Sequence, residues 1–169
     1  MRVSATLCSV DERAAELETL YREGFTRIRR GVMTVVGSWD EAGDVVQEAF
    51  AQVWRRREGF RGDGTLEAWV WKIALRIAGR RVSQARRRDE IAEGMAPVLP
   101  QAERIPELAE AFAELPPRRR LLVVLRYVGG LSYAEIADVT GITEGSVAGA
   151  LSKARRQLMR SLEERGVAP

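Results

Sequence analysis

The sequence predicts an all-α fold made of two small helical domains joined by a flexible linker, with a helix-turn-helix in the second domain. Apolar residues recur at steps of three and four, and no alternating run of β-branched residues indicates a strand. The sign of the charge reverses near residue 89, where a glycine and three prolines resist regular structure. We therefore expect helical domains at 11–88 and 106–165 and an acidic Pro/Gly linker at 89–105.

Three apolar stripes predict the helices of the first domain. The first stripe predicts a helix from about Asp11 to Val36, which the following glycine and serine end. A second stripe covers residues 42–54, and a third covers residues 66–82 after a glycine-rich loop at 60–64. Three amphipathic helices of this kind can close one small core.

The third of these helices carries a basic stripe. Seven basic residues and no acidic one occur between Lys72 and Arg88. Such charges usually form a solvated face, but seven uncompensated positive charges at helical spacing repel one another without a polyanion. We therefore expect a nucleic-acid backbone as the partner of this stripe, next to an exposed Trp71. The stripe consists of Lys72, Arg76, Arg80, Ser83 and Arg87.

The second domain opens with two short helices. The first carries Leu108, Phe112 and Leu115 and is broken by Pro116 and Pro117. The second is expected from Arg118 to Val128, where a pair of glycines stops it.

A helix-turn-helix follows. Ser132 and Glu135 form a capping box that starts a short helix, Gly141 supplies the turn, and Thr143 can cap the next helix. Val147 falls where this motif needs an apolar core residue. An ordinary helical hairpin is the alternative, but basic residues along the second helix favour DNA binding. These basic residues are Lys153, Arg155, Arg156 and Arg160.

The composition excludes several classes of function. The chain has 46% hydrophobic and 30% charged residues, as a soluble globular protein does. Cys8 is the only cysteine and there is no histidine, so an intramolecular disulfide, a zinc cluster and a histidine-based triad are excluded. We expect no metal, cofactor, small-molecule substrate or catalytic residue. No apolar run is long enough to span a bilayer and no signal peptide is evident, so we expect a cytoplasmic protein.

Three polar residues of the second helix form a separate patch. Asp44, Gln47 and Glu48 lie on one helical face, turned away from the apolar stripe. A nuclease or hydrolase would use such carboxylates for acid-base or metal chemistry, but no third ligand or phosphate loop accompanies them. A solvated face or a protein-docking patch is the better interpretation.

The motifs together resemble a known family. Asp44-Val45-Val46-Gln47-Glu48-Ala49-Phe50, Phe60-Arg61-Gly62 and Ala68-Trp69-Val70-Trp71-Lys72-Ile73-Ala74 are similar to conserved region 2 of bacterial sigma factors of the extracytoplasmic-function (ECF) type. Glu114-Leu115-Pro116-Pro117-Arg118 and Gly130-Leu131-Ser132-Tyr133-Ala134-Glu135-Ile136-Ala137 are similar to their region 4. The resemblance covers about residues 17–162, with the motifs in the family's order.

The resemblance implies a promoter-recognising subunit of RNA polymerase. Asp44, Gln47 and Glu48 match the residues that dock on the clamp helices of the core enzyme. The second domain would dock on the polymerase flap, with its last helix in the major groove of the −35 element. An anti-sigma factor that covers both domains is a further partner that the family implies, and it could hold the protein at the membrane.

The resemblance also assigns the residues that bind promoter DNA. Loop 60–64 matches the segment that captures a base flipped from the melting −10 element, and the helix over 65–88 would hold the −10 strand, with Trp69 in the core. The expected −10 residues are Phe60, Arg61, Gly62, Asp63, Trp71, Lys72, Arg76, Arg80, Arg81 and Arg87. The expected −35 residues are Thr143, Ser146, Ser152, Lys153, Arg155 and Arg156.

Two positions depart from the family pattern. Arg76 stands where the family usually has asparagine in the −10 helix. Ala148, Gly149 and Ala150 stand where the family usually has a basic residue, serine and arginine. Alanine and glycine have no donors for base edges, and each lost bidentate contact removes roughly 1–3 kcal/mol of discrimination. We therefore predict that the protein recognises the −35 element weakly.

A free-standing repressor or activator is the alternative function. It would use the same helix-turn-helix without polymerase and would need a dimerisation or ligand-sensing module. The first domain offers a basic stripe and a docking patch instead, which favours the polymerase subunit.

Overall fold

The computed structural model describes the backbone of residues 3–87 and 106–167, and the side chains of residues 12–85 and 106–167. All regular structure within these two segments is helical, which confirms the predicted all-α class. The predicted linker at 89–105 lies outside the described residues, as does the side chain of Arg87.

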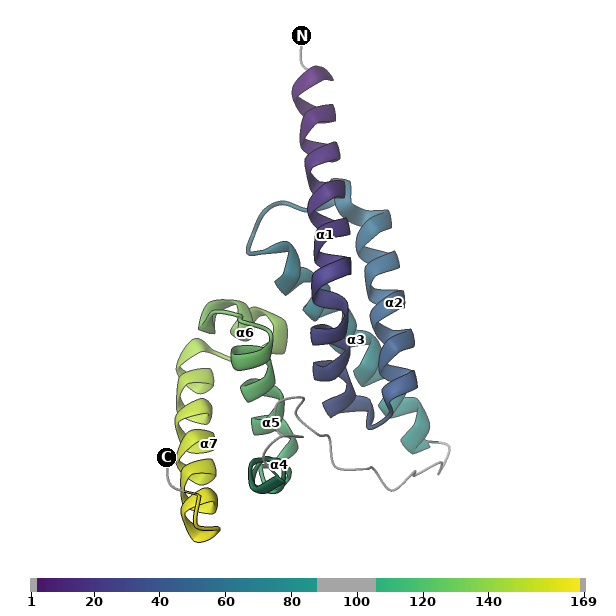
Figure 1. Cartoon of the computed structure of the whole chain (residues 1–169). Coiled ribbons are helices and arrows are strands. Elements are labelled where there is room, and N and C mark those ends of the chain that lie inside the picture. The colour runs from purple at the N-terminus through teal and green to yellow at the C-terminus, as the bar shows by residue number, and fades with distance from the viewer. Residues whose placement is uncertain (1–2, 88–105, 168–169) are drawn as a thin grey trace.

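Three helices form the N-terminal group and lie side by side (Figure 1). They are α1 (Val3–Val36), α2 (Trp39–Arg56) and α3 (Leu66–Arg87). The first helix begins at Val3, N-terminal to the start expected at Asp11. Ser38 caps α2 by accepting the N–H of Glu41 at 3.3 Å. Most residues of the apolar stripes face inward as predicted, and the fully buried residues between these helices include Ile28, Val32, Val45, Val46, Val53 and Val70.

The C-terminal group contains four helices. They are α4 (Pro106–Ala113), α5 (Pro117–Val123), α6 (Tyr133–Thr140) and α7 (Glu144–Glu164). The helix expected from Arg118 to Val128 ends as a π-helical turn, η3 (Val124–Val128). The N–H of Gly129 bonds to the carbonyl of Val124, five residues earlier, whereas an α-helix uses the carbonyl four residues earlier. The last turn therefore contains one residue more than an α-helical turn.

The helix-turn-helix has the predicted caps. The hydroxyl of Ser132 accepts the N–H of Glu135 at 3.2 Å, and the Glu135 carboxylate accepts the N–H of Ser132 at 2.9 Å. Gly141 ends α6 in the left-handed region, with φ of 73°, where a side chain would be strained. Thr143 then caps α7 by accepting the N–H of Ser146 at 3.2 Å. The sequence signals for both helices are confirmed.

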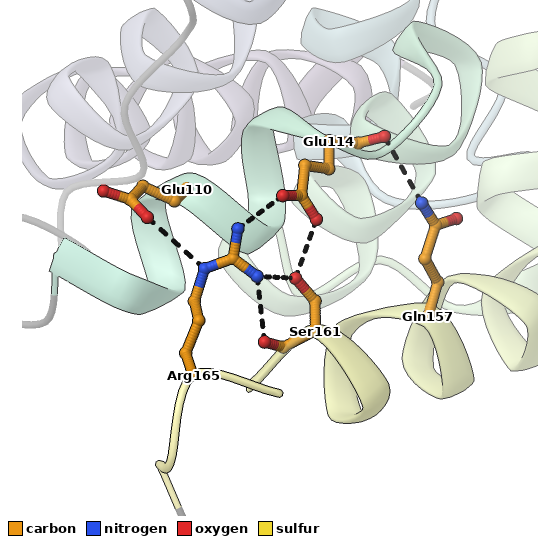
Figure 2. A network of polar contacts seen from close by, with 5 residues as sticks. All are labelled: Glu110, Glu114, Gln157, Ser161 and Arg165. Carbon is orange, nitrogen blue, oxygen red and sulfur yellow. Dashed lines mark hydrogen bonds and ion pairs between the residues drawn. The ribbon is translucent and has the colours of Figure 1, made fainter. Parts of the chain in front are cut away.

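A polar network fastens the end of α7 to α4 (Figure 2). Ser161, which is only 4% exposed, donates its hydroxyl to the carboxylate of Glu114 at 2.7 Å. Arg165 pairs with the same carboxylate and with Glu110, the latter at 3.3 Å. Gln157 donates to the backbone carbonyl of Glu114 at 3.3 Å. These contacts hold the C-terminal end of α7 against α4.

Both groups share one continuous apolar core, and Trp71 lies at their junction. The indole of Trp71 is completely buried, and it is close to Gly31 on α1, Val124 on η3 and Gly129. The expectation that Trp71 is exposed is therefore wrong, and in this structure its ring cannot meet the −10 strand. The helix α3 alone would expose this residue, but the C-terminal group covers it, and sequence periodicity cannot show that packing.

Candidate nucleic-acid interface

A stacked aromatic pair lies at the start of α3. The rings of Phe60 and Trp69 have centroids 5.1 Å apart and an interplanar angle of 19°. Thr65 holds this end of the helix in place, because its hydroxyl accepts the N–H of Ala68 at 3.1 Å and its carbonyl accepts the N–H of Trp69 at 3.2 Å. Trp69 is half-buried on this surface and not enclosed in the core as expected. The chain turns before α3, and this turn brings the ring of Phe60 against the ring of Trp69.

The aromatic pair lines a groove of about 820 Å³. Five of the residues expected at the −10 strand come together here: Phe60, Arg61, Asp63, Lys72 and Arg76. Arg56 and Trp69 line the same groove and were not expected from the sequence. Trp69 belongs to the apolar stripe predicted for the third helix. The sequence alone therefore could not distinguish it from an ordinary core residue.

Arg80 and Arg81 of α3 lie outside that groove. Arg81 pairs with Glu48 on α2 at 2.9 Å, so residues expected to meet DNA and polymerase contact each other. Arg80 is exposed. Gly62 is exposed too and has a φ of 81°, which loop 60–64 requires for its bend.

The C-terminal group forms the other wall of the groove. Lys72 lies 2.8 Å from the carboxylate of Asp138 on α6. Thr65 donates its N–H to the Glu135 carboxylate at 3.3 Å, and its hydroxyl also donates to that carboxylate. Burial raises the pKa of Glu135, but the hydrogen bonds from Thr65 and Ser132 outweigh it and hold that pKa below its usual value of 4.5. The carboxylate is therefore ionised at neutral pH and opposes the basic face of α3.

The exposed face of α7 agrees with a helix that can approach DNA. Ser146, Ser152, Lys153, Arg155 and Arg156 are all exposed, whereas Val147, Leu151 and Ala154 are buried. Arg156 donates to the hydroxyl of Ser152 at 2.8 Å. The hydroxyl of Thr143 is already used as the cap of α7, which leaves this residue a structural role in addition to the expected DNA contact.

The network that anchors α7 is electrostatically favourable. The hydrogen bond from Ser161, followed by that from Arg165, lowers the pKa of Glu114 below its usual value. The carboxylate of Glu114 raises the pKa of Arg165 in turn. The pair is therefore charged at neutral pH and holds α7 against α4.

The polar patch on α2 adjoins a second groove. Asp44, Gln47 and Glu48 are all exposed, as the spacing predicted. Gln47 also lines an apolar groove of about 730 Å³ between α1 and α2. Tyr21 and Trp54, which are 44% and 45% exposed, form the aromatic part of that groove. Both were assigned to apolar stripes from the sequence, so their exposure was missed.

The described segments hold neither a cluster of metal ligands nor a membrane-spanning helix. Within residues 3–87 and 106–167, no three His, Cys, Asp or Glu side chains gather closely enough to hold a metal ion. None of the helices in the same part of the chain has the length and apolar character of a membrane span.

Family models match both helical groups. Residues 12–88 match the model of sigma-70 region 2, and residues 105–158 match the model of sigma-70 region 4. Because sigma regions account for both groups of helices, the alternative of a free-standing repressor or activator is not supported.

Relatives with established names extend over most of the chain. The ECF RNA polymerase sigma factor SigL of Mycobacterium tuberculosis is 30% identical over 165 residues, which cover 91% of this chain and 93% of SigL. The ECF RNA polymerase sigma factor SigE of Mycolicibacterium smegmatis is 30% identical over 156 residues, and this match covers 83% of the chain but 59% of SigE.

Solved structures with the same fold include a sigma factor and a second protein, each in a complex. The sigma factor RpoE of Bartonella quintana, bound to the anti-sigma factor NepR, has a TM-score of 0.71 and 19% identity, covering 88% of this chain and 97% of RpoE. CnrH, bound to the cytosolic domain of CnrY, has a TM-score of 0.63 and 20% identity, covering 94% and 95%. At these identities the likeness supports the fold alone. With the region models and SigL, the conclusion is that the chain belongs to the ECF sigma factors of the sigma-70 family.

Proposed function

We propose that this protein is a promoter-specificity subunit of bacterial RNA polymerase, which binds the core enzyme, recognises the −10 and −35 elements and helps to melt the promoter. The groove around the stacked Phe60–Trp69 pair is the observation that carries this proposal. Aromatic rings beside cationic side chains suit a single DNA strand, because bases stack on the rings and phosphates pair with the cations. Stacking of this kind contributes about 1–3 kcal/mol per base.

Melting is then driven by binding and requires no catalytic residue in this subunit. The loop at 60–64 receives the flipped base of the −10 element, and Arg61, Lys72 and Arg76 lie where the phosphates of the captured strand would follow. Arg80 extends the basic surface along α3. The ring of Trp71 is enclosed in this structure and does not line the groove.

The groove between α1 and α2 is the proposed docking site for the core enzyme. Gln47 at its edge supplies hydrogen bonds, while Tyr21 and Trp54 offer apolar surface to a helical partner. Large aromatic residues with a polar tip are typical anchors of protein interfaces. Asp44 adds a charge next to this surface.

The C-terminal helix-turn-helix is the proposed −35 module, with α7 in the major groove. Ala148, Gly149 and Ala150 on this helix have no side-chain donors for base edges, so we expect weak sequence discrimination there. The polymerase compensates for this weakness, since tethering both domains to one enzyme raises their effective concentration at the promoter. We accordingly assign residues 11–88 and 106–165 to separate DNA-binding domains joined by residues 89–105.

Control by an anti-sigma factor is part of the proposal. Solved neighbours of the same fold are bound to such a partner or to a cytosolic domain, and a protein that covers both domains would block both promoter contacts. A polymerase subunit works where the chromosome is, so we place this protein in the cytoplasm. We assign it no enzymatic activity of its own.

A pull-down with core polymerase tests the proposed docking site. We expect the wild-type protein to be retained by immobilised core enzyme, and Gln47→Ala and Trp54→Ala to weaken retention. Glu163→Ala, an exposed change on α7 outside both grooves, serves as the control. If core polymerase does not retain the wild-type protein, the proposed function is wrong.

A further inference from the structure

An arginine–tryptophan pair lies at each end of α2. At the C-terminal end, Cζ of Arg57 lies 4.5 Å from the ring centroid of Trp54, and Nη1 of Arg57 donates to the Trp54 carbonyl at 2.8 Å. At the N-terminal end, Cζ of Arg29 lies 4.1 Å from the ring centroid of Trp39, and Nε of Arg29 donates to the Trp39 carbonyl at 2.9 Å. In each pair the guanidinium covers the ring of the tryptophan whose backbone it binds. Two contacts with one residue restrict the orientation of that ring.

Of these two tryptophans, Trp54 alone lines the groove between α1 and α2 that is proposed to dock the core enzyme. Its side chain is 45% exposed there, next to Tyr21. Arg57 is half-buried and does not line the groove. The side chain of Arg57 therefore acts on the groove through the ring that it covers.

A half-exposed indole binds a partner best when its orientation is already fixed. A side chain that becomes immobilised only on binding lowers the affinity, whereas a side chain held in its bound orientation does not. The planar guanidinium of arginine stacks well on an indole ring. Nε of Arg57 is buried without a hydrogen-bond partner among the described residues, a cost that the contacts with Trp54 offset.

Arg57 also ends the helix. Its backbone N–H donates to the carbonyl of Trp54, which makes it the C-cap of α2. A cation at the C-terminus of a helix is favourable as well, because it faces the negative end of the helix dipole. A capping role alone would change the stability of the protein and leave its affinity for a partner in the groove unaltered.

We propose that Arg57 is a positioning residue of the docking groove, which holds the ring of Trp54 in the orientation that meets the core enzyme. This inference rests on the proposed function. It assigns a role in docking to a residue outside the groove and outside the polar patch of α2. The pair of Arg29 and Trp39 has the same chemistry at the other end of α2 and provides a matched control.

Fluorine NMR of the full-length protein labelled with 5-fluorotryptophan reports the rings directly. The chain has four tryptophans, and single Trp→Phe replacements assign their lines. Glutamine at position 57 can still donate to the carbonyl of Trp54 but places no charge on its ring. We expect Arg57→Gln to shift the line of Trp54 and to leave that of Trp39 in place, and Arg29→Gln to do the reverse. A Trp54 line that stays in place in Arg57→Gln would overturn the inference.

Titration of immobilised core polymerase with the full-length protein measures the consequence for docking. We expect Arg57→Gln to weaken binding about two- to fivefold, as for loss of one cation–π contact at an exposed site. Arg57→Lys should restore most of the affinity, because an ammonium group also binds the face of an indole. Arg29→Gln is expected to bind as the wild type does. In a Trp54→Ala background, Arg57→Gln should have no further effect, since the two side chains act as one unit.

The outcomes separate this inference from the proposed function. An unchanged affinity of Arg57→Gln, an equal loss in Arg29→Gln, or the same loss with and without Trp54 would overturn the inference and leave the polymerase subunit intact. A wild-type protein that does not bind core polymerase would overturn the proposed function and this inference with it. Circular dichroism of each variant shows that it is folded.

Discussion

Trp69 and Trp71 are two residues apart on α3 and have opposite roles. Trp69 stacks on Phe60 at the edge of the groove, whereas Trp71 is enclosed between Gly31 and Gly129. The sequence predicts Trp69 in the core and Trp71 exposed, which is the reverse of their burial. The reason is that a second group of helices packs against α3, and this contact is invisible in the periodicity of one helix.

Replacement of the two tryptophans distinguishes their roles. We expect Trp71→Ala to lower the free energy of unfolding by about 3–5 kcal/mol, because it opens a cavity in a packed core. Trp69→Ala removes mainly a ring contact worth about 0.5–1.5 kcal/mol and should instead weaken strand binding. Urea unfolding checks the first effect and DNA binding the second. Equal destabilisation by both changes would contradict the assignment.

Glu135 gives the stability of the protein a dependence on acid pH. Its pKa in the folded protein is below 4.5, so its ionised form stabilises the fold at pH values above 4.5, and this contribution is lost as the pH falls through the lowered pKa. We expect Glu135→Gln to flatten the decline in stability below pH 4.5. Urea unfolding of both proteins on either side of that pH is the measurement. A variant with an unchanged acid limb would show that the hydrogen bonds from Thr65 and Ser132 do not hold the charge.

At the scale of the helices, the sequence predicts local features well. The capping box at Ser132, the left-handed Gly141 and the cap at Thr143 lie where their sequence signals place them, because each depends on a few neighbouring residues. The π-helical turn at 124–128 and the extension of α1 to Val3 were not predicted. The groove around Phe60 was expected from a family resemblance, but the wall formed by α6 depends on contacts between distant segments.

The recognition helix α7 contains a glycine that costs stability. A Cβ at Gly149 would meet nothing within 4 Å, and this position has ordinary helical geometry. We expect Gly149→Ala to raise the free energy of unfolding by about 0.5–1 kcal/mol, since alanine favours helix more than glycine does. Thermal unfolding measures the gain. A loss of stability would mean that the backbone at this position is strained.

The same helix predicts weak recognition of the −35 element. We expect footprints of the holoenzyme to show −35 protection that tolerates single base changes, because Ala148, Gly149 and Ala150 have no side-chain donors. Changes in the −10 element should reduce protection much more. Strong −35 protection that one base change abolishes would contradict this expectation.

At the scale of the whole molecule, the two helical groups pack against each other. The core is continuous from the α1–α2–α3 group to α5 and η3, and Asp138 on α6 pairs with Lys72 on α3. The groove proposed as the polymerase-docking site is lined by residues of α1 and α2 and lies apart from the contact between α3 and α6.

Transcription by core polymerase reconstituted with this protein tests the central claim most directly. We expect RNA to start at a defined set of promoters, mapped by sequencing 5′ ends, and Gln47→Ala and Trp69→Ala to reduce the yield. Starts that depend on a shared −10 element would agree with a promoter-specificity subunit. Transcripts that are the same with and without the protein would contradict it.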